Sequence, residues 1–159
     1  MGRIDVMARW YTVDHSVWEY REKKMGLAAA STGSMPQKPF DAKSVELEPW
    51  PAWPPEDTLE GEVKHSGTVL VRDASGAMSV GIWECPPCKF RDHQTSTSTA
   101  QILSGRGVLI HEATGERIEL KPGVQFVASP DGSAVIWEIH ETIRKFYVLH
   151  EPGHEDRYY

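Results

Sequence analysis

The 159-residue chain has two cysteines, no long hydrophobic run and fewer basic than acidic residues. No stretch approaches the roughly 18 consecutive apolar residues of a membrane-spanning helix, and no compact apolar segment behind a basic start suggests a secretory signal. The net charge of −6, from 17 basic and 23 acidic residues, argues against a nucleic-acid-binding protein and against simple attraction to an anionic membrane. We therefore expect a cytoplasmic protein without nucleic-acid or membrane partners.

Several common catalytic motifs are also missing. The sequence has no glycine-rich phosphate loop, no dinucleotide-binding fingerprint and no nucleophile elbow. ATP, NAD and serine-hydrolase chemistry therefore lack their usual sequence signals. What remains is the ordinary composition of a globular domain, with 40% hydrophobic and 25% charged residues in a chain long enough to bury a core without disulfides.

The composition divides the chain into three parts. Residues 1–56 form the first part, in which apolar residues spaced by three and four predict an amphipathic helix before a Pro- and Trp-rich extended arm. We expect Trp50 and Trp53 of this arm to lie against the barrel or a neighbouring subunit, with a loosely ordered linker as the alternative. Residues 57–153 form the barrel, and residues 154–159 form a polar tail.

The barrel region consists of short alternating segments separated by Gly, Pro, Asp and Ser turn signals. Many short strands at even spacing are typical of a sandwich or jelly-roll barrel. The predicted strands cover residues 67–73, 78–85, 89–94, 98–104, 107–113, 117–121, 124–128, 134–140 and 143–150.

Six short motifs occur in order in this region, at 81–85, 89–91, 102–105, 120–123, 137–139 and 144–149. Together they resemble the cupin superfamily over roughly Asp57 to Pro152, and within it small single-domain cupins related to ureidoglycine aminohydrolase and to ethanolamine-utilisation cupins. The resemblance implies an all-β fold, a double-stranded β-helix or jelly-roll barrel, which would follow the N-terminal helix and extended arm predicted above. It also implies a homodimer.

Cupins generally bind a metal through a His pair, a Glu and a third His. By the resemblance, these positions fall on Arg91, His93, Ser98 and about Val135. A divalent metal needs at least three well-placed N, O or S donors, and this set supplies one imidazole. We therefore expect no metal cofactor, although a divalent metal bound through other ligands remains an alternative.

Arg91 and His93 are the first candidate catalytic residues. They share a strand face, and the family pattern points that face into the barrel. A neutral imidazole in a dry pocket suits proton transfer near pH 7, and an inward guanidinium suits a substrate carboxylate. The alternative is a solvent-exposed turn near the barrel rim.

A second group of candidates lies on the last strands. Trp83 and Trp137, with Val135 and Ile139 on the face of Trp137, are expected to form the walls of a substrate pocket. Filling the core is the alternative role for both tryptophans. Ser98 offers a hydroxyl to a polar substrate.

Lys145 and Tyr147 also share a strand face and are expected to stabilise developing oxyanion charge. The alternative is that Arg144 or Lys145 makes a structural ion pair on the sheet, for which Glu84 or Glu138 could supply the carboxylate.

Cys85 and Cys88 flank Pro86-Pro87, and several roles are open to them. The spacing permits a redox dithiol, but no helix follows to lower the pKa of the first thiol. A zinc site from Cys85, Cys88 and His93 is a further alternative, since three ligands with an open position are typical of catalytic zinc. A rigid turn with incidental thiols is the interpretation we favour.

Together these features predict a cupin-fold enzyme that acts on a small organic metabolite by metal-independent acid/base chemistry. The accessible reactions are isomerisation, cyclisation, elimination and dehydration, as in isomerases or lyases. Two alternatives stay open: a non-catalytic cupin that binds a small molecule, and a metal-dependent lyase or oxygenase with non-standard ligands.

Overall fold

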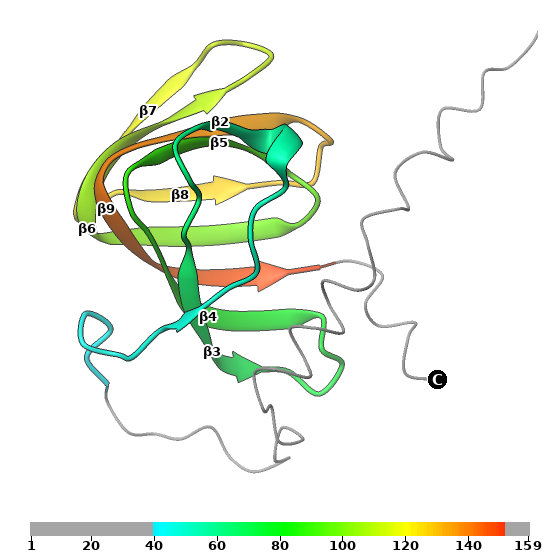
Figure 1. The fold of residues 1–159 in the computed structure, drawn as a ribbon. Coiled ribbons are helices and arrows are strands. Elements are labelled where there is room, and N and C mark those ends of the chain that lie inside the picture. The colour runs from blue at the N-terminus through cyan, green and yellow to red at the C-terminus, as the bar shows by residue number, and fades with distance from the viewer. Residues whose placement is uncertain (1–39, 152–159) are drawn as a thin grey trace, which may run out of the picture. The chain divides into compact units, whose positions relative to one another are not determined.

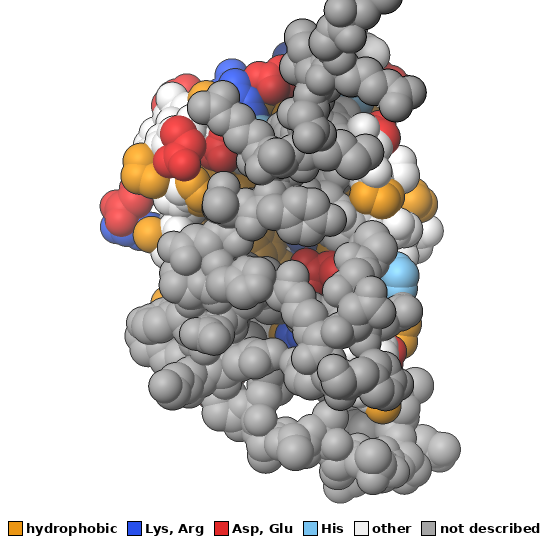
Figure 2. Space-filling model, turned by 90° about the vertical axis from the view of Figure 1, so that its right-hand side faces the viewer, with side chains coloured by type: hydrophobic (Ala, Val, Ile, Leu, Met, Phe, Trp, Pro, Cys, Tyr) orange, Lys and Arg blue, Asp and Glu red, His pale blue; other side chains and the backbone are white. Residues whose placement is uncertain are grey.

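The computed structural model describes residues 40–151, which form a curled antiparallel sheet (Figure 1). The predicted N-terminal helix, the start of the arm and the tail lie outside these residues. Among the described residues, no helix has the length and apolar character required to cross a bilayer. On the visible part of the face in Figure 2, acidic, basic and hydrophobic side chains are interspersed, without an extended basic region.

The described elements are nine strands and one short 3-10 helix. Every pairing between the strands is antiparallel. The elements are β1 (Glu48–Pro49), η2 (Pro55–Asp57), β2 (Thr58–Glu60), β3 (Ser66–Arg72), β4 (Met78–Cys85), β5 (Cys88–His93), β6 (Thr97–His111), β7 (Arg117–Leu120), β8 (Gln125–Ala128) and β9 (Ala134–His150).

Two long strands, β6 and β9, organise the barrel. They pair with each other along most of their length, from Thr97 opposite His150 to His111 opposite Val135. The first half of β9 also pairs with β5 and its second half with β4, while β6 also pairs with β7 and β8. The sheet therefore folds back on itself around these two strands, as the ribbon in Figure 1 shows.

The all-β fold is confirmed, but two predicted strand breaks are wrong. Residues 98–104 and 107–113 belong to the single strand β6, which continues through a register shift at Ser104–Arg106. Residues 134–140 and 143–150 likewise belong to β9. The glycine and charged residues at these two bends are residue types that also form turns, which is why breaks were predicted there. In a strongly curved sheet, a strand can instead continue through such residues by forming a bulge.

The core contains alternate side chains from β4, β5, β6 and β9. Phe90 of β5, Ile102 of β6 and Ile143 of β9 are each at most 1% exposed. Trp50 and Trp53 of the arm pack against this core. The Nε1–H of Trp53 donates to the carbonyl of Arg91 at 3.0 Å. The arm residues that the structure describes therefore lie against the barrel of their own chain.

His65 fixes the path of the arm across the barrel. Trp83 Nε1–H donates to His65 Nδ1 at 3.1 Å, so the other ring nitrogen, Nε2, carries a proton and donates to the carbonyl of Pro51 at 2.7 Å. The rings of Trp50 and Trp53 both meet the His65 ring edge-on. One buried imidazole thus joins the arm to β4.

Arg144 of β9 holds the segment that contains Ala42 and Val45, which precedes the arm tryptophans, against the barrel. The residue is 8% exposed, and its side chain donates to the carbonyls of Ala42 and Val45 and to the carboxylate of Glu84. Charged donors that satisfy buried carbonyls contribute more than neutral ones.

We expect Arg144→Met to lower the free energy of unfolding by about 2 kcal/mol, because it removes these three bonds while keeping the apolar stem. Chemical denaturation measures this loss. Arg106→Met is the matched control, since Arg106 is 62% exposed and reaches Glu141 only at 3.9 Å, and it should cost less than about 0.5 kcal/mol. Equal losses in the two variants would contradict the anchoring role.

Candidate functional site

Four aromatic rings meet inside the barrel. Trp83, Phe90 and Trp137 are 5%, 1% and 2% exposed. The Phe90 and Trp137 rings are stacked at 6.1 Å, Trp83 lies 5.5 Å from Trp137, and Phe126 meets Trp137 edge-on at 5.8 Å. The two tryptophans predicted as pocket walls therefore lie side by side, and Trp137 is at the centre of the group.

Lys145 places its amine against these rings. Its register partners are Trp83 on β4 and Ile102 on β6, which directs the side chain to the interior face. Nζ lies 4.5 Å from the centroid of Trp83, 4.4 Å from that of Trp137 and 6.0 Å from that of Phe126. Among the described residues, no carboxylate lies within ion-pair distance of Nζ.

The surroundings of Lys145 disfavour its charge. Burial lowers the pKa of Lys145 from 10.5 to about 8, and the attraction of nearby Asp92, with a smaller contribution from Cys85, only partly offsets this effect. Of the two cations expected to make a structural ion pair, Arg144 does so with Glu84. Lys145 does not, and Glu138 pairs with Lys89 instead. Lys145 is thus an interior amine whose pKa lies close to physiological pH, so that both its charged and its neutral forms are populated there.

Asp92 is the second charged group of the interior, and sequence patterns alone did not reveal it. Its Oδ2 accepts a hydrogen bond from Trp137 Nε1 at 3.3 Å. Burial raises the pKa of Asp92, against the opposing field of Lys145. Trp137 therefore touches Lys145 through its ring face and Asp92 through its ring edge.

The predicted inward orientation of Arg91 and His93 is wrong. On β5 the interior face holds Cys88, Phe90 and Asp92, so the residues between them point outward. The motif alignment assigned the opposite face. The apolar residues at positions 88 and 90 are the signal that indicates the correct one, because alternate residues share a face.

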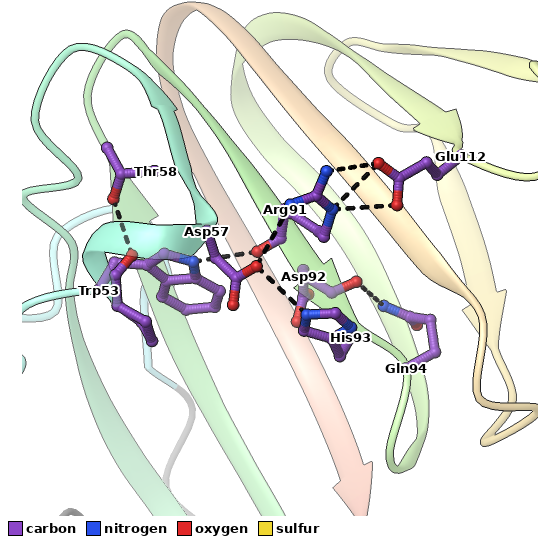
Figure 3. A network of polar contacts seen from close by, with 9 residues as sticks. Trp53, Asp57, Thr58, Arg91, Asp92, His93, Gln94 and Glu112 are labelled. Atoms are coloured by element: carbon purple, nitrogen blue, oxygen red, sulfur yellow. Dashed lines mark hydrogen bonds and ion pairs between the residues drawn. The ribbon is translucent and has the colours of Figure 1, made fainter. Parts of the chain in front are cut away.

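Figure 3 shows where Arg91 and His93 lie instead. Arg91 makes a two-pronged contact with Glu112, with Nη2–Oε1 at 2.6 Å and Nε–Oε2 at 3.0 Å, and Nη1 lies 3.5 Å from Asp57 Oδ1. His93 Nε2 lies 3.2 Å from the same Asp57 oxygen. Because this network joins η2, β5 and the end of β6, it fits the alternative of a rim contact.

The other predicted residues lie on the interior faces of their strands. Val135 and Ile139 are 9% and 4% exposed, on the same face of β9 as Trp137. Tyr147 is buried two positions after Lys145, opposite Gly81 and Ala100. Ser98 is half-buried at the start of β6 and alternates with buried Ala100 and Ile102.

The donor set does not fit the metal of a typical cupin. Within residues 40–151, no three His, Cys, Asp or Glu side chains are grouped closely enough to hold an ion. Of the expected ligand positions, Arg91 and His93 lie on the outer network, and Val135 has no donor atom. The zinc alternative also fails among these residues, since Cys88 and His93 are at opposite ends of β5.

Cys85 and Cys88 nevertheless form a buried pair across the Pro86-Pro87 turn. Their sulfur atoms are 3.5 Å apart, and the residues are 0% and 8% exposed. The shared hydrogen bond, helped by burial, raises the pKa of the Cys85 thiol, and the same bond lowers the pKa of Cys88. The favoured proton arrangement is therefore a Cys85 thiol that donates to a Cys88 sulfur.

We expect iodoacetamide to modify Cys88 well before Cys85 in the folded protein, because the thiolate is the nucleophile and Cys88 is the more exposed. Peptide mass mapping over a time course distinguishes the two sites. Cys85→Ala should slow the reaction of Cys88 at pH values below the ordinary thiol pKa of 9.0, because the variant removes the hydrogen-bond donor that lowers this pKa. Faster modification of Cys85, or no change in the variant, would contradict this proton arrangement.

One cavity opens beside the aromatic group. Its volume is about 160 Å³, and Phe126 borders both the cavity and the surroundings of Lys145. Its walls come from β6, β7, β8 and the turn before β9. The lining residues are Gln94, Leu109, His111, Glu116, Ile118, Phe126, Val127, Ala128, Ser129, Asp131, Ser133 and Val135.

The barrel is similar to known proteins in both sequence and structure. Residues 72–147 match the family model described as a EutQ-like cupin domain. The barrel therefore resembles a EutQ-like cupin domain. This confirms the predicted resemblance to cupins and to their ethanolamine-utilisation group. No curated protein matches the chain.

Solved structures support the cupin fold. A protein of unknown function from Pseudomonas syringae pv. tomato superposes with a TM-score of 0.60 and 21% identity, over 69% of this chain and 46% of that one. The EutQ protein of Clostridium difficile gives a TM-score of 0.53 and 14% identity, over 72% and 87% of the two chains. The cupin domain of Schizosaccharomyces pombe Cnp3 gives 0.53 and 14%, over 75% and 72%. At these identities the likeness concerns the fold alone.

Proposed function

We propose that this cupin domain binds a small organic molecule inside its barrel and transfers a proton on it, with Lys145 as the reacting base or acid. The observation that carries the proposal is an amine that lies over two indole rings without a carboxylate at ion-pair distance among the described residues. Burying an amine without a carboxylate partner costs folding free energy. Such a costly placement is typical of a group that takes part in function.

The electrostatics support acid/base chemistry. A general base works best when its pKa lies near the working pH, and the pKa of Lys145 is about 8. Asp92, whose pKa is raised by burial, would act as the complementary acid on the other side of Trp137. A base whose pKa is lowered toward 7 and an acid whose pKa is raised toward 7 are together typical of a catalytic acid/base pair.

The remaining residues have supporting roles in this proposal. Trp83 and Trp137 would contact the apolar part of the substrate and exclude water. Tyr147, two positions along β9 from Lys145, would donate its hydroxyl to an oxygen that gains negative charge. The reaction class stays as the sequence predicts it: isomerisation, cyclisation, elimination or dehydration.

Deuterium exchange across a panel of compounds tests the proposal. Full-length protein in D₂O is incubated with a defined set of small 2-oxo acids, hydroxy acids, aldehydes and ketones, and proton NMR follows each C–H signal. We expect at least one compound to lose a C–H signal or convert, and Lys145→Met to reduce that rate at least about 100-fold.

Two other outcomes would contradict the proposal. Line broadening without exchange would favour a non-catalytic binding protein. Exchange that is unchanged in Lys145→Met, in protein whose circular dichroism matches the wild type, would place the chemistry elsewhere.

A further inference from the structure

Lys145 has the surroundings of a nucleophilic amine as well as of a base. Its Nζ lies 4.5 and 4.4 Å from the Trp83 and Trp137 centroids, so two rings replace much of its water shell. A lysine becomes nucleophilic when an apolar pocket removes water and no carboxylate holds the ammonium form. Both conditions are met among the described residues.

The amine is also available in the right form. With a pKa of about 8, roughly a quarter of Lys145 is neutral at pH 7.5, against about one part in a thousand for an ordinary lysine. Lys145 and Asp92 each keep some accessible surface, and both contact the Trp137 side chain, Lys145 at the ring face and Asp92 at Nε1. A small molecule that reaches one of these polar groups is therefore within one indole ring of the other.

We infer that Lys145 forms an imine with the carbonyl carbon of a small aldehyde or ketone, and that Asp92 carries the protons of this step. The inference rests on the proposed function, since it needs the barrel to admit a small molecule. It narrows the substrate class to carbonyl compounds.

The step balances without a further reagent. The Nζ lone pair attacks the carbonyl carbon, and the oxygen takes a proton from the Asp92 carboxyl. The Asp92 carboxylate then accepts a proton from nitrogen, which gives a neutral carbinolamine. Asp92 returns that proton to the hydroxyl, water leaves, and nitrogen forms the double bond to carbon. One neutral amine, one carbonyl and the proton of the Asp92 carboxyl thus give one protonated imine, one water and the Asp92 carboxylate.

The site also suits the product. The protonated imine is a cation in the position of Nζ, where the faces of Trp83 and Trp137 attract positive charge. The Asp92 carboxylate left by the last proton transfer attracts it further, while Trp137 Nε1–H holds that carboxylate in place. The same two contacts would stabilise the electron-withdrawing iminium that eases proton removal from the neighbouring carbon.

Reductive trapping tests the inference. Full-length protein is incubated at pH 7.5 with propanal, benzaldehyde or pyruvate and sodium cyanoborohydride, and peptide mass mapping locates the added groups. We expect at least one probe to label Lys145 at least tenfold faster than Lys121, which is 52% exposed and serves as the internal reference. Lys145→Arg keeps the charge and should abolish labelling of its peptide.

Labelling of Lys145 no faster than Lys121 with all three probes would overturn the inference. If the exchange measured in D₂O still depends on Lys145, the proposed function stands and only the covalent step fails. If trapping succeeds without exchange or conversion, the imine stands and the proposed turnover fails. Asp92→Asn should slow trapping of Lys145 severalfold while leaving Lys121 unchanged, and an unchanged Lys145 rate would remove Asp92 from the proton transfers.

Discussion

Gly105→Ala is expected to lower the free energy of unfolding by about 4 kcal/mol or more. Gly105 has φ +87°, which costs an L-residue about 1–2 kcal/mol. An added Cβ would lie 2.1 Å from the carbonyl oxygen of Thr142 and 2.7 Å from Cα of Ile143, both backbone atoms of β9. Relief of this overlap requires the two central strands to separate at their corner, where Ile143 is fully buried.

Gly123→Ala provides the matched control. Gly123 has φ +91°, almost the same conformation, but a Cβ there meets nothing within 4 Å. In this variant the free energy of unfolding should fall by only about 1 kcal/mol, the cost of placing alanine in a left-handed backbone conformation. Urea denaturation of both proteins measures the difference, and equal losses would show that the contact between β6 and β9 at Gly105 is not as tight as described.

Trp137→Ala is expected to cost about 4 kcal/mol, the second-largest effect. Trp137 is 2% exposed and contacts Trp83, Phe90 and Phe126, so its removal leaves a large cavity at the centre of the aromatic group. The variant also removes one ring from Lys145 and the hydrogen-bond donor from Asp92. Thermal unfolding should therefore move to lower temperature by roughly 10 °C or more.

Trp137→Phe separates packing from hydrogen bonding. It keeps an aromatic ring and should cost about 1–2 kcal/mol, but it deprives Asp92 of the Nε1–H donor. Since that donor lowers the pKa of Asp92, the pKa should rise further in this variant. A loss as large as that of Trp137→Ala would mean that the hydrogen bond, rather than the packing, holds the interior together.

Much of the barrel could be predicted from alternation and turn residues. Alternation in 134–139 and the turn residues around Pro122 and Pro130 correspond to observed strands and turns. The breaks assigned at Gly105 and near Glu141 do not, because a bulge and a turn use the same residue types. Which one forms depends on the curvature of the whole sheet, which no local pattern contains.

The candidate site was predictable only in part. Lys145, Tyr147, Trp83 and Trp137 were identified because strand alternation puts them on shared faces. Asp92 was missed because the predicted orientation of β5 was wrong by one residue. Neighbouring residues on a strand point to opposite faces, so Arg91 was placed inside and Asp92 outside. The pairing of Arg91 with Glu112 depends on the meeting of β5 with the end of β6, a contact between residues 21 positions apart.

Direct titration of the Lys145 amine tests the central claim. In full-length protein with ¹³C-labelled lysine, NMR follows each Cε signal from pH 6 to 12, and Lys145→Arg assigns the signal of interest by its loss. The account predicts that this signal titrates with a pKa of about 8. A midpoint at or above the ordinary lysine value of 10.5 would show a fully charged, solvated ammonium and would contradict it.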